Sequence, residues 1–314
     1  MRSLLRKTKE LLNRREPFVL VVVTEKKGSA PRDAGAAMIV TKNGLFEGTV
    51  GGGAIEYHCI ERAKELLREE KSDRAHYTLS KDSAKDIGMI CGGENRVLFQ
   101  YFSPKEGEML RNFSDDHVAM ALFLDGTTPL LVSAGDALLH RNSYNRVVRD
   151  GYREVFLWDL RKPPKAFVFG GGHVSRAVVP LLHFLNFRVH VLENRPEFLL
   201  EEDLPLAEER MLVEYDNLPK LPMGSEDYVI ILTRGHESDG QVLRQCFSYD
   251  PTYIGMIGSK RKSGALFRAL REEGVSEEQI EKVHTPVGLD IGAETPEEIA
   301  VSIVAEIIQN KEKK

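Results

Sequence analysis

A glycine triplet that joins a strand-like segment to a helix-like one is the feature that most limits how this chain can fold. Residues 165–169 form a mostly apolar, strand-like segment, residues 170–172 are all glycine, and a helical pattern follows. Gly170 and Gly172 match the first two glycines of a G-x-G-x-x-G motif, and the small Ser175 stands at the third. Glycine allows a tight turn there, and the first turn of the helix offers amide donors to a phosphate. The segment predicts a site for a phosphate-bearing ligand.

An acidic residue is expected about 20 residues after such a turn, where it accepts hydrogen bonds from a ribose. Glu193 stands at this place, at the end of the strand-like segment 188–193, and Arg195 follows it. Glu193 can accept from a ribose hydroxyl, and Arg195 can hold a phosphate. From residue 165 onward, strand-like and helix-like segments alternate, which indicates a parallel sheet covered by helices. We therefore predict a C-terminal Rossmann-like, doubly wound parallel sheet. A Rossmann domain that binds nothing is the alternative.

The chain before residue 163 has a different pattern. Residues 18–25 form a β-branched run, and Asn43-Gly44 separates two apolar runs, which is a strong signal for a hairpin. A helix is expected over residues 54–70. Pro163 and Pro164 cannot continue a helix or the hydrogen bonding of a β-sheet. They follow two basic residues, which favour exposure to solvent. We predict an N-terminal α+β domain over residues 1–162, including a middle lobe, and a Rossmann-like domain over 163–314.

Composition excludes several classes of function. The chain has 314 residues, a formal net charge of −5 and three cysteines. Without a broad basic field, nucleic acid is not an expected partner, and the negative charge disfavours an anionic membrane. Apolar runs such as residues 19–23 are far too short to cross a bilayer. Scattered cysteines give no disulfide framework, so the cytoplasm is the expected compartment.

Three features of the N-terminal part are candidate binding elements. Gly51, Gly52 and Gly53 precede the expected helix, so an anion can dock on its first turn near Glu56, unless the turn is only a packing feature. Arg32, in a loop stiffened by proline, presents a planar fork to a phosphate or carboxylate; the alternative is an ordinary surface arginine. Cys91 lies in a glycine-bounded loop, where its thiol can contact a soft metal or sulfur, although most cysteines are inert core residues.

Two further loops are expected at the carboxyl ends of parallel strands, where ligands bind in such sheets. His236 and Asp239 follow one strand, and Gly258 and Ser259 follow the next. His236 can act as an acid or base near neutral pH. The alternatives are a helix cap by Asp239 and a solvated basic turn. The sequence contains no recognisable set of metal ligands and no nucleophile motif, so neither catalytic nor metal residues are predicted.

The chain resembles the xanthine dehydrogenase accessory factor family, XdhC/CoxI. The resemblance rests on ordered motifs that cover most of the chain outside the middle lobe. These motifs are GSAPRDAGAAMIV (28–40), GTVGGGAIE (48–56), MICGGE (89–94), FGGGHVSRA (169–177), LENRPEF (192–198), LTRGHESD (232–239), YIGMIGSKRKSG (253–264) and TPVGLDIGAETPEEIAVSIVAEI (285–307).

This resemblance implies a chaperone-like factor, rather than an enzyme. Such a factor binds molybdenum cofactor (molybdopterin), protects it during sulfuration and delivers it to an apo molybdenum hydroxylase of the xanthine dehydrogenase type. A cysteine desulfurase is a further candidate partner, and the cofactor's dinucleotide form remains open. By carry-over, Gly170, Gly172 and His173 are expected to contact a phosphate or the pterin. Arg32 and the turn 51–53 are expected to line the domain cleft, and Cys91 is a candidate contact to the metal or its sulfur.

Two departures and one rival interpretation remain. The family often has a cysteine where this chain has Ala54, which leaves Cys91 as the single candidate thiol. Glu193 replaces the commoner aspartate, which keeps the charge and lengthens the reach. The rival interpretation is an NAD(P)-dependent oxidoreductase, favoured by the glycine motif with Glu193 and Arg195, although no residue set positions a hydride acceptor. A homodimer is the expected assembly.

Overall fold

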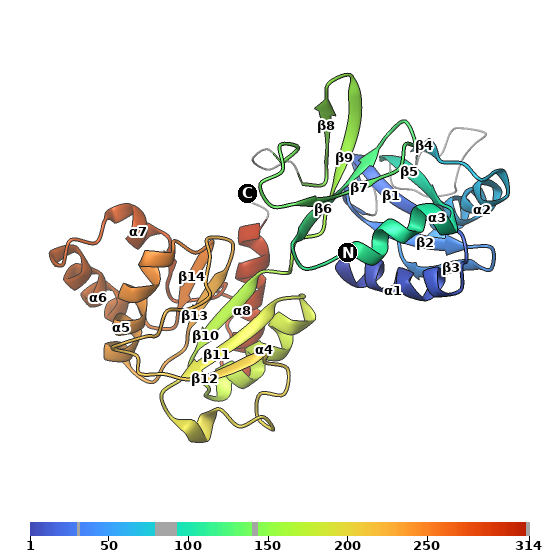
Figure 1. Ribbon diagram of the computed structural model, residues 1–314. Coiled ribbons are helices and arrows are strands. Elements are labelled where there is room, and N and C mark those ends of the chain that lie inside the picture. The colour runs from blue at the N-terminus through green and yellow to red at the C-terminus, as the bar shows by residue number, and fades with distance from the viewer. Residues whose placement is uncertain (30–31, 79–92, 140–143, 312–314) are drawn as a thin grey trace. The chain divides into compact units, whose positions relative to one another are not determined.

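The computed structural model describes residues 1–29, 32–78, 93–139 and 144–311 (Figure 1). The chain divides into two compact units, Met1–Lys162 and Pro163–Lys314. Each unit has its own buried clusters of apolar side chains.

The N-terminal unit contains one sheet with strand order β3-β2-β1-β5-β4 and another with order β7-β6-β9-β8, among the residues described. Its elements are α1 (Arg2–Asn13), β1 (Phe18–Lys27), β2 (Ala37–Thr41), β3 (Gly44–Gly48), α2 (Gly53–Glu69), β4 (Asp73–Thr78), β5 (Glu94–Phe102), α3 (Pro104–Gly107), the 3-10 helix η1 (Glu108–Asn112), β6 (His117–Phe123), β7 (Leu130–Ser133), β8 (Arg146–Asp150) and β9 (Arg153–Asp159). Both sheets are antiparallel where their pairing is described.

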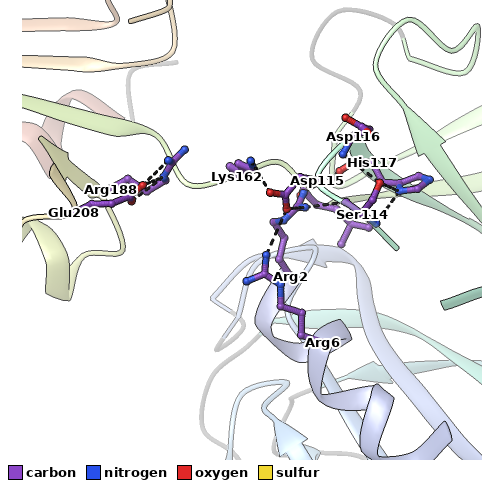
Figure 2. Close-up of polar contacts among 10 residues, drawn as sticks. Arg2, Arg6, Ser114, Asp115, Asp116, His117, Lys162, Arg188 and Glu208 are labelled. Carbon is purple, nitrogen blue, oxygen red and sulfur yellow. Dashed lines mark hydrogen bonds and ion pairs between the residues drawn. The ribbon is translucent and has the colours of Figure 1, made fainter. Parts of the chain in front are cut away.

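Helix α1 is fixed to the second sheet by a nearly buried arginine. The Arg2 guanidinium donates to the carbonyl oxygen of Ser114 (2.9 Å) and to Asp115 Oδ1 (2.7 Å) (Figure 2). It also donates to the carbonyl oxygen of Leu160 (2.7 Å). Lys162 Nζ lies 2.8 Å from the other oxygen of Asp115. The leucines of α1 face the same core, so the amphipathic pattern of the first residues is explained by packing.

The C-terminal unit contains a parallel sheet with strand order β12-β11-β10-β13-β14-β15 among its described residues. In chain order this is 3-2-1-4-5-6, the arrangement of a Rossmann fold. Its elements are β10 (Lys165–Phe169), α4 (His173–Phe184), β11 (Arg188–Glu193), the 3-10 helix η2 (Pro196–Phe198), β12 (Glu209–Leu212), β13 (Tyr228–Ile231), α5 (His236–Cys246), the 3-10 helix η3 (Phe247–Tyr249), β14 (Tyr253–Met256), α6 (Lys260–Glu272), α7 (Glu277–Glu281), β15 (Val283–His284) and α8 (Pro296–Lys311).

Helices cover both faces of this sheet (Figure 1). The side chains of β10 alternate between the two faces. Val168 packs in one core with residues of α4 and α8. Phe167 and Phe169 pack in the other with residues of α5 and α6. A strand that is apolar on both faces must be buried on both, which confirms the predicted doubly wound fold.

The hairpin predicted at Asn43-Gly44 is present, because β2 and β3 pair antiparallel across it. β6 and β7 also pair antiparallel, across the segment that contains Asp125-Gly126. Within the residues that the structure describes, no helix is long and apolar enough to cross a membrane.

Candidate functional site

The turn after β10 combines two crowded glycines with one open position. Gly170 has a φ of +112°, and a Cβ there would lie 2.4 Å from the carbonyl oxygen of Leu232, at the end of β13. A Cβ on Gly171 would lie 2.2 Å from the carbonyl oxygen of Phe198. At Gly172, by contrast, no described atom lies within 4 Å of such a Cβ. The turn is therefore closely packed on its protein side and open at the start of α4.

The first turn of α4 keeps its amide donors available. Gly172 is the N-cap residue, and no side chain of the described residues caps the helix. His173, the first helical residue, is exposed. Ser175, at the third motif position, is fully buried, as a residue that sits between helix and strand must be. An exposed, uncapped helix start with partial positive charge suits an anion.

Glu193 is tied into the glycine turn. Its side chain is 1% exposed, and its Oε2 accepts from the Gly171 amide (2.9 Å) and from Arg195 Nη2 (2.9 Å). Its Oε1 accepts from the amides of Asn194 (2.9 Å) and Arg195 (3.1 Å) and from Arg195 Nε (3.0 Å). Burial raises the pKa of Glu193, but the Arg195 and Gly171 hydrogen bonds outweigh this and leave the pKa below its ordinary value.

These five donors use the acceptor capacity of the Glu193 carboxylate, which has about four lone-pair sites. Arg195 is committed to Glu193 and stacks on Phe198, with its guanidinium carbon 4.0 Å from the ring centroid. The expected roles, Glu193 on a ribose and Arg195 on a phosphate, stay predictions. They require this pair to open. In the structure, Glu193 positions the Gly171 backbone.

The two loops that follow β13 and β14 lie at the same carboxyl end of the sheet as the glycine turn. Asp239, 3% exposed, accepts from the Thr233 hydroxyl at 2.5 Å, so it stabilises the loop before α5. Gly235, not Asp239, is the N-cap residue of α5. After β14, Gly258 precedes the N-cap Ser259. Ligand contacts by Asp239, Gly258 and Ser259 remain predictions.

The second loop contains a contact that no sequence pattern indicated. Ser263 Oγ lies 3.2 Å from the Ser259 carbonyl oxygen and 2.8 Å from Thr285 Oγ1. The contact of Thr233 with Asp239 was not predicted from sequence either. Thr233, Ser263 and Thr285 all fall inside motifs of the family resemblance, and these motifs are the signal that could have revealed them.

In the glycine turn before α2, backbone amides donate to a carboxylate from the first turn of α2 itself. Gly51, Gly52 and Gly53 all have positive φ (+139°, +70° and +59°), which only glycine adopts readily. Glu56 Oε2 accepts from the Val50 amide and the Gly52 amide, both at 3.1 Å, and from the Thr49 hydroxyl. Burial raises the pKa of Glu56, but these hydrogen bonds outweigh it and hold the pKa below its ordinary value. The carboxylate occupies the place where an external anion was expected, so an anion there must displace Glu56.

Replacing Glu56 by glutamine is expected to lower the free energy of unfolding of the N-terminal unit by about 1–2 kcal/mol, because three donors lose a charged acceptor. Trp158 is the chain's single tryptophan and is fully buried in this unit, so its fluorescence during urea denaturation reports the change. Glu61→Gln, on the same helix, removes a partly exposed pair with Lys64 and should change stability by less than about 0.5 kcal/mol. Equal effects of the two variants would contradict the assigned role.

The remaining candidate residues are Arg32, Cys91 and His236. Arg32 is exposed. Cys91 lies outside the described residues, as does the side chain of His236, whose backbone begins α5. Among the residues described, no group of three or more His, Cys, Asp or Glu side chains could hold a metal ion. Within the C-terminal unit the structure thus brings together the glycine turn, Glu193, Arg195 and the end of β13. The N-terminal candidates Arg32 and Glu56 belong to the other unit.

A Rossmann-like unit with a glycine turn at its first helix, following an antiparallel α+β unit, defines the class of protein. A family model described as the XdhC Rossmann domain matches residues 167–307, and the XdhC and CoxI family model matches residues 11–78. The chain belongs to the XdhC and CoxI family.

Three curated relatives and one solved structure are similar over nearly the whole chain. The chain is 29% identical over 297 residues to YqeB of Escherichia coli (strain K12), covering 94% of this chain and 44% of that protein, so it spans less than half of that relative. It is 26% identical to a probable xanthine dehydrogenase subunit of Bacillus subtilis (strain 168), covering 96% of each. It is 24% identical to the molybdenum cofactor insertion chaperone PaoD of Escherichia coli (strain K12), covering 98% of this chain and 87% of PaoD. A crystal structure from Bacillus halodurans, described as a xanthine dehydrogenase, has a TM-score of 0.74 at 22% identity, covers 99% of this chain and 96% of that chain, and bears on the fold alone.

Proposed function

We propose that the protein is an accessory factor that binds molybdenum cofactor and delivers it to an apo molybdenum hydroxylase of the xanthine dehydrogenase type. Family membership and the names of the Bacillus subtilis protein and of PaoD support an accessory role. Neither name settles what this chain carries. The cofactor is cargo in this proposal, so the protein need not catalyse a reaction on it.

The observation that carries the binding step is the open, uncapped start of α4. Molybdopterin bears a phosphate, and the free amides after Gly172 offer donors and partial positive charge to that group. The exposed His173 lies beside them and can add a further hydrogen bond. Glu193 acts indirectly, because it holds the Gly171 backbone in the conformation that exposes the next residues.

Gly172→Asp tests this site with little risk to the fold. The position is open and has a φ of −75°, and aspartate is a favoured N-cap residue, so α4 should keep or gain stability. The added carboxylate occupies the donors and repels a phosphate. Gly172→Asn is the matched control, because asparagine caps about as well without the charge.

The experiment uses protein made in a host that synthesises molybdenum cofactor and purified without oxygen. Bound pterin is measured after oxidation to its fluorescent derivative. We expect pterin in the wild type, a fall of at least about tenfold in Gly172→Asp, and a smaller fall in Gly172→Asn. No pterin in any sample, together with tight NAD(P) binding and turnover of a substrate, would favour the oxidoreductase instead.

Cys91→Ala, in the same assay, tests the thiol. If pterin content falls although the circular dichroism spectrum is unchanged, Cys91 contributes to retention of the cofactor. If pterin content is unchanged, the role proposed for Cys91 is wrong.

A further inference from the structure

A strongly cationic pocket lies in the N-terminal unit, near the end of α2. Its volume is about 560 Å³. Its lining includes five cationic side chains, Arg14, Arg15, Lys42, Lys64 and Arg68. They come from the segment after α1, from the turn between β2 and β3, and from the last part of α2. In the same wall Glu16 is the acidic residue, and Pro17 and Leu67 add apolar surface.

The pocket concentrates positive charge that the protein itself neutralises only in part. Lys64 Nζ pairs with Glu61 at 2.8 Å, and Arg14 reaches Glu10 only at 4.0 Å. For Arg15, Lys42 and Arg68 the structure gives no ion pair with any described residue. This local excess stands out in a chain whose formal net charge is −5. Cationic side chains this close together repel one another unless an anion lies between them.

Glu16 supplies the second observation. Its Oε1 is buried, yet it has no hydrogen-bond partner among the described residues. A buried carboxylate oxygen without a donor is costly, so a ligand hydroxyl toward which the Glu16 side chain turns would relieve it. Phosphate oxygens cannot donate such a bond in their ionised form, but a hydroxyl group can. The wall therefore has cationic donors for phosphate groups and one acceptor for a hydroxyl.

We propose that this pocket binds an organic diphosphate with free hydroxyl groups, of which a nucleoside diphosphate is the simplest example. Arginine matches phosphate oxygens with its planar fork, and lysine adds point charges. The volume lies in the range of small-molecule sites, about 300–1,000 Å³. This site goes beyond the proposed function, because it lies at the opposite end of α2 from the turn 51–53, about 25 Å along a helix of 17 residues.

The structural alternative is that these cations only balance the partial negative charge at helix ends. Arg14 follows α1, and Arg68 lies in the last turn of α2, so both have such a role available. Lys42 has none, because it lies in the turn between β2 and β3. Lys42 nevertheless lines the pocket, which favours ligand binding over a role at a helix end.

The test is calorimetric titration of the full chain with ADP at low ionic strength. The Gly172→Asp variant serves as the background, so that binding at the C-terminal glycine turn is suppressed. The double variant Lys42→Glu/Arg68→Glu should weaken ADP binding at least about tenfold, because two phosphate-binding charges are reversed. Lys105→Glu/Lys220→Glu makes the same change in net charge at exposed lysines outside the pocket and should leave the affinity within about twofold.

Several other results would contradict the proposal, each for its own reason. No heat from ADP at millimolar concentration rejects the site, and equal loss in both double variants reduces it to non-specific attraction. Inorganic pyrophosphate should bind at least about threefold more weakly than ADP, because it cannot donate to Glu16. Equal affinity would reject the hydroxyl contact, and tighter binding of an acidic hexapeptide would assign the pocket to a protein partner. Pterin retention by wild type is measured separately, so failure here leaves the proposed function untouched.

Discussion

Replacing Gly170 by alanine is expected to lower the free energy of unfolding of the C-terminal unit by about 3–5 kcal/mol. Two costs add. The φ of +112° is strained for any residue with a Cβ, and that Cβ would lie 2.4 Å from the backbone oxygen of Leu232. Because the clash is with backbone, relief requires β10 and the end of β13 to separate, which disturbs the central strand pair of the sheet.

Gly172→Ser is the matched control for Gly170→Ala. The two positions are two residues apart in one turn, but a side chain at Gly172 meets no described atom within 4 Å, and serine can cap α4. Its stability should be unchanged or higher by up to about 1 kcal/mol. Hydrogen exchange by mass spectrometry on β10 and β13 measures both variants, with peptides of the N-terminal unit as an internal reference. If β10 and β13 exchanged hydrogen as slowly in Gly170→Ala as in wild type, the close packing of the turn would be unimportant for stability.

The C-terminal fold could be predicted because its signals are local. Each central strand is apolar on both faces and each is followed by a helix, so the parallel sheet follows from the alternation. β12 and β15 were missed because they are short edge strands with weak patterns. Neither Glu209–Leu212 nor Val283–His284 has a fully buried run.

The middle of the N-terminal unit was harder to read because its defining contact is not local. β8 and β9 pair across Gly151, a turn whose Asp-Gly sequence could have revealed the hairpin. The pairing of β6 with β9, from Ala119 opposite Asp159 to Phe123 opposite Val155, joins segments that no local pattern connects. Trp158 links the two sheets by donating to the Gly35 carbonyl oxygen at 2.9 Å, a contact that only the folded chain reveals.

For the candidate site, the sequence does not reveal which contacts the two acids make within the folded chain. Glu193, at the end of β11, and Glu56, after the turn 51–53, were both expected to lie at a ligand site. In the structure Glu193 accepts from the Gly171 amide and Glu56 accepts from the Gly52 amide, and their roles toward a ligand stay predictions. A carboxylate binds free backbone amides by the same physics as a phosphate does, and sequence spacing cannot tell an internal anion from an external one. The structure also indicates which helix start remains open, that of α4.

Glu193→Gln is expected to lower the free energy of unfolding of the C-terminal unit by about 2–4 kcal/mol at neutral pH. An amide group in place of one carboxylate oxygen turns a donor toward Gly171 or Arg195, and the Arg195 charge loses its partner. Because Arg195 is 27% exposed and can reach water, the loss should be smaller than that for a fully buried pair. Glu197→Gln, an exposed neighbour, is the control and should change stability by less than about 0.5 kcal/mol.

The same variant should also change how stability depends on pH. The folded-state pKa of Glu193 is below the ordinary value of 4.5, so the folded protein holds this proton more weakly than the unfolded chain. The stabilisation is therefore complete above pH 4.5 and is lost as the pH falls through the lower folded-state pKa. Urea denaturation followed by hydrogen exchange between pH 7 and pH 3 should show the gap between wild type and Glu193→Gln narrowing toward acid. A gap that stayed constant over this range would mean that the Glu193 charge does not stabilise the glycine turn.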